Sequence, residues 1–195
     1  MMRIRSFAAN IVVALALQGC AGTATVISSA QQQSLQSLQL FGADASPRFT
    51  FDLACTSEDA SCVTVEHAFA NWAQDRHVSL QSVEPDDASF RPGHPSTPRA
   101  AGVPYRLAVR FAPLVIASFN KINVSQGGFL SGDYKPPQVG YIATLYVFDA
   151  ASGKLMQQVP FHEQRTADFK ADAGDYLRVE VKNFVASLDP AYSHE

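Results

Sequence analysis

The stretch GYIATLYVFDAASGKLMQQVPF, residues 140–161, decides the fold. Two apolar runs flank the turn-forming segment Asp149–Gly153, which predicts a β-hairpin. The run Tyr141–Phe148 is apolar on both faces, so we expect this strand near the centre of a sheet. Pro160 cannot donate a ladder hydrogen bond, which predicts that the second strand lies at an edge or carries a bulge.

Four segments before the hairpin also have strand patterns. Residues 105–111, YRLAVRF, alternate apolar side chains with Arg106 and Arg110, as expected of a strand with one buried face. The other three segments are RFTFDLA (48–54), HVSLQSV (77–83) and, after Pro113, LVIASFNKINV (114–124).

Two segments show the periodicity of amphipathic helices. The first, Cys62–Gln74, carries its apolar stripe at Val65, Ala68, Phe69, Trp72 and Ala73. The second carries its stripe at Leu177, Val181, Phe184, Val185 and Leu188 and ends at Asp189-Pro190. We expect Trp72, the only tryptophan, to be buried against the sheet. The order β-α-β-β-β-β-β-α predicts an α+β fold, a single domain with a mainly antiparallel sheet and two amphipathic helices packed on one face.

Two long exposed loops are expected, at 84–104 and 125–138, because both are rich in proline or glycine. Loops of this length on an α+β scaffold are often functional. The second loop contains Phe129 and Tyr134, aromatic side chains that a purely solvated loop does not need. We expect Phe129 and Tyr134 to form part of a partner-binding surface. The alternative is that they fold back on the edge of the sheet.

The cysteines of the body are Cys55 and Cys62. An even pair in an exported chain predicts a disulfide, here between the end of a strand and the start of a helix. The rival interpretation is a redox or metal site. That interpretation is not favoured, because the spacing is not C-x-x-C and no histidine lies between the two cysteines.

The N-terminal segment has the architecture of an export signal. Arg3 and Arg5 precede the apolar run Phe7–Leu17, which is too short to span a hydrocarbon core of about 30 Å as a helix. Removal of both arginines with the signal takes the formal net charge from −3 to about −5. A mildly acidic body argues against a nucleic acid partner.

The apolar run ends in Leu17-Gln18-Gly19-Cys20, which resembles the lipobox of bacterial lipoproteins. The resemblance implies that Cys20 is lipidated and that the chain is cut before it, which anchors the protein to a membrane. Ala21 stands where Asp favours inner-membrane retention in enterobacterial lipoproteins, so the pattern is similar to that of outer-membrane lipoproteins facing the periplasm. The expected organisation is a signal peptide at 1–19, the lipidated cysteine and a spacer at 20–46, the α+β domain at 47–189 and a tail at 190–195. The spacing of the leucines near 35–38 leaves a short helix as an alternative for part of the spacer.

The body carries no motif for catalysis or metal binding. There is no H-E-x-x-H helix and no G-x-S-x-G elbow. The segment SQGGFLSGD, 125–133, lacks the Gly-Lys-Ser/Thr of a phosphate loop. We therefore expect no catalytic residue, no metal and no cofactor.

Residues 48–188, through the strand YRLAVRF and the hairpin ATLYVFDAASGKLMQQ, resemble small Gram-negative envelope lipoproteins of unknown function. The resemblance implies no catalytic residues. We expect a membrane-anchored envelope lipoprotein that acts as a non-enzymatic binding or accessory protein with an envelope protein as its partner. One alternative is a carrier of an apolar, lipid-like ligand. The other is an enzyme whose site is assembled from distant residues.

Overall fold

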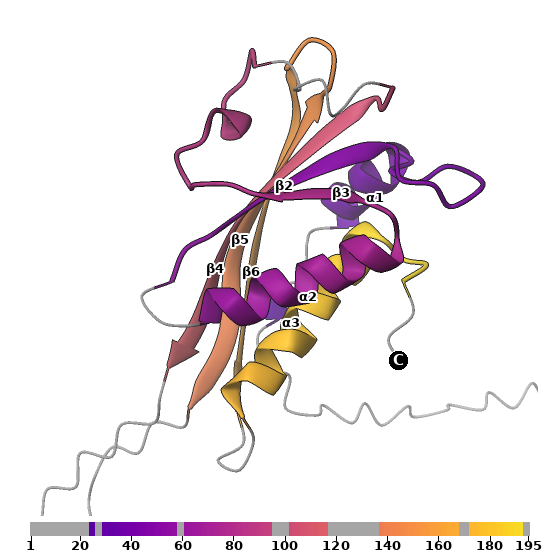
Figure 1. Cartoon of the computed structure of the whole chain (residues 1–195). Coiled ribbons are helices and arrows are strands. Elements are labelled where there is room, and N and C mark those ends of the chain that lie inside the picture. The colour runs from indigo at the N-terminus through magenta and orange to yellow at the C-terminus, as the bar shows by residue number, and fades with distance from the viewer. Residues whose placement is uncertain are drawn as a thin grey trace, which may run out of the picture.

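A six-stranded sheet forms one layer of the computed structural model, which describes residues 24–25, 29–57, 61–94, 102–116, 137–167 and 172–192 (Figure 1). The strand order is β1-β6-β5-β4-β2-β3. The pairs β1–β6, β6–β5 and β5–β4 are antiparallel, whereas β2 is parallel to both β4 and β3. The strands are β1 (Ala24–Thr25), β2 (Phe49–Cys55), β3 (Ser79–Ser82), β4 (Tyr105–Ile116), β5 (Gln138–Asp149) and β6 (Leu155–Thr166).

The hairpin that decides the fold is present as β5 and β6. As predicted, β5 lies in the interior of the sheet, and β6 has only the two-residue β1 as its outer neighbour. The ladder between β5 and β6 contains a bulge beside Val147 and Phe148. Pro160 lies outside the two positions that pair with β1, so its missing N–H removes no bond to that strand.

The prediction of two separate strands on either side of Pro113 is wrong. Residues 105–111 and the start of 114–124 form the single strand β4, which continues through Pro113 to Ile116. The reason is that β2 pairs with β4 only as far as Phe111. Beyond that point Pro113 pairs with β5 on one side and has no described strand on the other, so the missing N–H is tolerated.

Helices α2 (Ser61–Asp75) and α3 (Ala173–Leu188) pack side by side on one face of the sheet (Figure 1). This confirms the predicted α+β arrangement. The α3 helix begins at an N-cap, because the Asp172 carboxylate accepts a hydrogen bond from the Gly174 amide at 2.9 Å.

Aromatic side chains fill the space between the helices and the sheet. Trp72 is buried, as predicted, and its ring meets the Phe51 ring edge to face at 5.3 Å. Phe184 of α3 packs against Phe111 of β4 and Phe161 of β6 at 5.8 and 4.7 Å. Such contacts between aromatic rings add to the stabilisation that comes from burying their surface.

The segment expected to be a spacer, 20–46, is folded in its second half. Residues Ser29–Ser37 form helix α1, and Leu35, Leu38 and Leu40 lie in the main core. Phe41 contacts Phe49 edge to face at 5.4 Å. Four apolar side chains can thus be buried by folding this segment back, which a solvated spacer would leave in water. The short helix left open as an alternative is the arrangement found.

The segment 84–104, which is expected to be an exposed loop, is partly buried. Residues 83–94, called the strap below, cross the second face of the sheet and include the short helix η1 (Ala88–Phe90). Phe90 is buried there, against a small cluster formed by Ala54, Ala108 and Phe148. Two arginines of β4 donate to strap carbonyls: Arg106 to Ser89 and His94, and Arg110 to Pro85.

Candidate functional site

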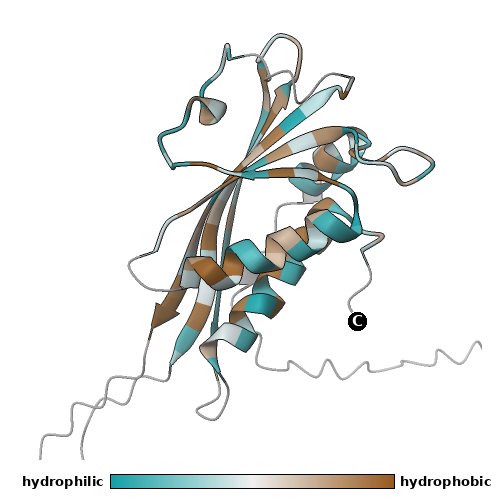
Figure 2. Ribbon diagram, in the orientation of Figure 1, coloured by the Kyte–Doolittle hydropathy of each residue, from teal (hydrophilic) through white to brown (hydrophobic). Residues whose placement is uncertain are grey.

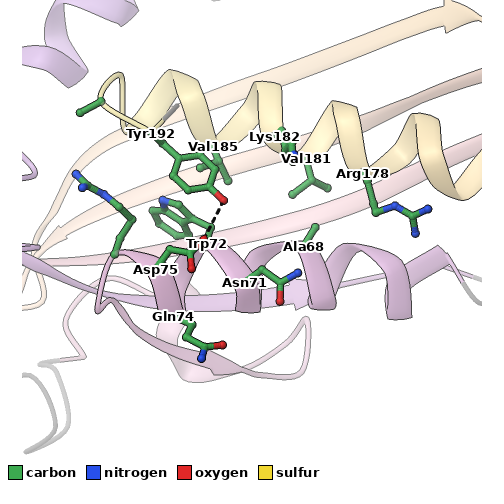
Figure 3. Close-up of a pocket in the computed structure, with 12 residues that line it drawn as sticks. Ala68, Asn71, Trp72, Gln74, Asp75, Arg178, Val181, Lys182, Val185 and Tyr192 are labelled. Atoms are coloured by element: carbon green, nitrogen blue, oxygen red, sulfur yellow. Dashed lines mark hydrogen bonds between the residues drawn. The ribbon is translucent and has the colours of Figure 1, made fainter. Parts of the chain in front are cut away.

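A groove of about 580 Å³ runs between α2 and α3 on the side of the helices away from the sheet (Figure 3). Half of its lining side chains are polar or charged. The lining residues are Ala68, Asn71, Trp72, Gln74, Asp75, Arg76, Arg178, Val181, Lys182, Val185, Ala191 and Tyr192. Its volume lies within the range of sites that take small ligands or short peptide segments.

Asp189 lies at one end of this groove, where it contacts two of the lining side chains, Arg76 and Trp72. It is buried, and its Oδ2 accepts a hydrogen bond from Arg76 Nε at 2.7 Å and from Trp72 Nε1 at 3.3 Å. Its Oδ1 accepts a second bond from Arg76 Nη2 at 3.2 Å. The two-point contact with a guanidinium fixes the end of α3 against the end of α2, so this end of the groove is built before any ligand arrives.

Tyr192, just after α3, covers the same end. Its hydroxyl donates to Asp75 Oδ2 at 3.4 Å, the contact drawn as a dashed line in Figure 3. Burial raises the pKa of Tyr192, and the neighbouring Asp75 carboxylate raises it further. The hydroxyl is therefore a donor throughout the physiological pH range.

The other end of the groove carries positive charge. Arg178 and Lys182 lie on successive turns of α3 along the rim (Figure 3). Arg178 forms an ion pair with Asp175, and both side chains are exposed to solvent. An exposed ion pair contributes little stability, so Arg178 can leave Asp175 for a ligand at low cost. The lining residues include no Ser, Thr, Cys or His. The arrangement of the groove suits noncovalent binding.

A second cluster of charges lies between α3 and the sheet. Glu180 is fully buried, and Arg165 Nη2 of β6 lies 2.5 Å from its Oε1. Within the described part of the chain, neither carboxylate oxygen of Glu180 has a partner with hydrogen-bond geometry. Burial raises the pKa of Glu180 to about 7, with a further increase from the Glu163 carboxylate and an opposing effect from Arg165. Burial and the Glu163 carboxylate also raise the pKa of Tyr141.

This second cluster has no access for a ligand, because Glu180 is covered completely by α3 and the sheet. The Glu180 carboxylate of this cluster takes up a proton near neutral pH. We therefore assign the cluster to pH-dependent stability, and the α2–α3 groove is the candidate site for a ligand or partner.

The predicted cysteine pair is found as a disulfide. Cys55 and Cys62 are bonded, with their Cα atoms 5.7 Å apart, and they join the end of β2 to the start of α2. Cys20, Phe129 and Tyr134 lie outside the described residues. Among the residues described, no three His, Cys, Asp or Glu side chains gather as metal ligands. None of the helices in that part of the chain is long and apolar enough to cross a membrane.

Two features of the site are not evident from the sequence analysis above. The pairing of Arg76 with Asp189 joins residues far apart in the chain, and Asp189 by itself predicts only the end of a helix. Glu180 does carry a signal, because it lies three residues after Leu177 and four before Phe184 on the apolar stripe of α3. A carboxylate in that position predicts a buried charge.

No protein-family model matches the sequence, and no curated protein matches it. Among solved structures, the chain is similar to the PelC dodecamer from Paraburkholderia phytofirmans, with a TM-score of 0.42 and 12% identity over 72% of this chain and 88% of that one. It is also similar to lipoprotein GNA1162 from Neisseria meningitidis, with a TM-score of 0.38 and 10% identity over 73% of this chain and 99% of that one. The proposals below rest on this chain's own residues.

Proposed function

We propose that this chain is a lipid-anchored envelope protein that binds a protein partner through the α2–α3 groove and has no catalytic activity. The observation that carries the binding role is the groove itself. It is a preformed concave surface with a buried Trp72 at its base and a cationic rim formed by Arg178 and Lys182. A surface of this kind recognises a partner by shape, hydrogen bonds and charge.

The anchor is proposed from the sequence. The apolar run Phe7–Leu17 is followed by Leu17-Gln18-Gly19-Cys20, the pattern that resembles a lipobox. Lipidation at Cys20 with several acyl chains would hold the protein at a membrane, since each buried CH₂ contributes about 0.8 kcal/mol. Ala21 in place of Asp favours the outer membrane, with the domain in the periplasm.

A pull-down from detergent-solubilised envelopes tests the binding role. Asn71→Trp places a large side chain in the groove, whereas Ala70→Trp places the same side chain at the neighbouring exposed position outside it. The wild type and Ala70→Trp should recover the same partner, and Asn71→Trp should lose most of it. Equal recovery by all three proteins would remove the groove from the binding surface.

The loop residues Phe129 and Tyr134 remain a second proposed contact with that partner. Replacing both by Ser should leave the melting temperature close to that of the wild type and should reduce the partner recovered. Unchanged recovery would leave the groove as the binding surface without them.

A carrier of an apolar ligand is the second candidate, and the groove does not favour it. The groove opens to solvent, and half of its lining is polar or charged. An apolar ligand gains most from an enclosed and largely apolar cavity.

A further inference from the structure

One half of the second face of the sheet, the face opposite α2 and α3, carries no Lys, Arg, Asp or Glu side chain among its described residues, and its one histidine is His162. The register of the ladders places the even-numbered residues of β4, β5 and β6 together on this face. From 112 to 116, 138 to 144 and 158 to 166, none of these even-numbered residues is Lys, Arg, Asp or Glu. We call these residues the uncharged face.

The strap does not cover this half of the sheet. It packs on Ala54, Ala108 and Phe148, toward the other end of the strands. Arg110, which borders the uncharged face, lies 4.4 Å from the Phe90 ring of the strap. On the uncharged face, Ile116 is 42% exposed and Ile142 is 49% exposed. The hydrophobic end of β4 is brown in Figure 2.

The described segment nearest in sequence to Cys20 is β1, which pairs with β6. Ala24 of β1 follows Cys20 by four residues, which span at most about 14 Å when fully extended. Thr25 pairs with His162 of β6, and His162 pairs with Ile142 of β5. Neighbouring strands are about 4.8 Å apart, so Ile142 lies about 10 Å from β1 across the sheet.

The direction of β1 agrees with this placement. Because β1 is antiparallel to β6, its N-terminal end points toward Thr166. At that end of the sheet Thr166 pairs with Gln138, and Gln138 pairs with Ile116. The N-terminal end of β1 is therefore directed toward the end of the sheet at which the uncharged face lies.

We propose that the uncharged face rests on the phospholipid bilayer in which Cys20 is anchored. The proposal depends on the proposed lipidation of Cys20. A face without Lys, Arg, Asp or Glu contacts the interface without removing water from these charged side chains, and its exposed isoleucines gain by leaving water. The short link to the anchor holds the face at a high effective concentration near the lipid. The face can therefore stay in contact with the bilayer even if its own affinity for lipid is weak.

Depth-dependent fluorescence quenching tests the proposal on the full lipidated protein. With Cys20 lipidated and Cys55 bonded to Cys62, an introduced cysteine is the only free thiol for an environment-sensitive dye. The dye is placed on the uncharged face by Ile142→Cys or by Thr166→Cys, and on the helical layer by the matched variant Val179→Cys, whose residue is 44% exposed on α3. Each protein is bound to phosphatidylcholine vesicles that contain a nitroxide-labelled lipid.

We expect loss of most of the fluorescence at 142 and 166 and little loss at 179. Added salt should have little effect on the result, because the face carries no Lys, Arg, Asp or Glu. Equal quenching at all three positions, or none at 142 and 166, would overturn the proposal. Two results without vesicles would also overturn it. Dye at 142 already shielded from water would place residues 117–136 on the face, and a signal that depends on protein concentration would place a second copy there.

The absence of lipid on Cys20 is a separate outcome from the absence of quenching. A protein without lipid on Cys20 would have no acyl mass and would not float with the vesicles, which contradicts the proposed function. Labelled proteins that float and yet show no quenching on the uncharged face contradict only the present proposal. If Ile142→Cys does not fold, Thr166→Cys carries the test, since Thr166 is an exposed side chain at the end of β6.

Discussion

Asp189 joins two helices through one carboxylate. It accepts hydrogen bonds from both Arg76 and Trp72, and it is almost completely buried. The Arg76 guanidinium also lies 4.8 Å from the centre of the Phe41 ring, so the segment that follows α1 meets the same cluster. Removing the carboxylate leaves a largely covered cation and an indole N–H without their acceptor.

The expected loss for Asp189→Ala is about 3 kcal/mol of unfolding free energy, because a buried ion pair is broken on one side only. Asp175→Ala is the matched control, since Asp175 pairs with Arg178 at an exposed site. That change should cost less than about 1 kcal/mol. Urea unfolding of both variants measures the difference. Similar losses for the two variants would mean that Asp189 does not hold the helices together.

Glu180 makes the stability of the protein depend on pH. Its pKa in the folded protein is raised to about 7, above the value of 4.5 of an unperturbed glutamate. Between these two values the folded state binds more protons than the unfolded state, so the unfolding free energy falls as pH rises. The stabilisation is complete below the unfolded pKa and is lost as pH rises through the folded one.

Glu180→Gln should remove this dependence. The wild type is expected to melt at a higher temperature near about pH 5 than near about pH 8, and the variant should show a smaller difference. Glu66→Gln, at an exposed position on α2, should keep the wild-type profile. A wild-type melting temperature that rises over this interval would contradict the assignment.

At the scale of the elements, the sequence predicts what depends on local pattern. The periodic stripe of α2 and the hairpin of β5 and β6 are both found where their residues predict them. Helix α1 is harder to predict because its sequence, SAQQQSLQS, has few apolar residues. Its place in the fold is set by the contacts of Leu35 and Leu38 with the core, which only the tertiary structure supplies.

The strap is harder to predict for the same reason. Its prolines and acidic residues are typical of a solvated loop, yet Phe90 is buried on the second face of the sheet. Phe90 lies 4.4 Å from the Arg110 guanidinium and meets the Tyr146 ring edge to face at 5.8 Å. Phe90, together with the hydrogen bonds from Arg106 and Arg110, therefore holds a segment whose composition indicates exposure.

Phe90→Ala should release the strap and leave the sheet folded. The reason is that the main core lies on the other face and does not include Phe90. Hydrogen exchange of the amides of residues 83–94 should become faster, while that of β4 and β5 should change little. Arg91→Ala, at the neighbouring exposed position, is the control and should leave the exchange unchanged. Uniform acceleration over the whole chain would show that Phe90 belongs to the main core.

At the scale of the whole molecule, the sequence predicts the fold class better than the binding site. The α2–α3 groove depends on how two distant helices end against each other, through Arg76 and Asp189. No local pattern encodes that contact. The uncharged face likewise emerges only when the register of three strands is known, since its residues are distributed over β4, β5 and β6.

The anchor at Cys20 is the central claim, because it places the groove and the uncharged face relative to a membrane. The most direct measurement is the intact mass, followed by N-terminal fragmentation, of the protein purified from bacterial envelopes. We expect a chain that begins at Cys20 and carries diacylglyceryl and N-acyl groups, and we expect Cys20→Ala to give an unprocessed chain without lipid. A wild-type protein that keeps residues 1–19, or one cut elsewhere without added lipid mass, would contradict the account.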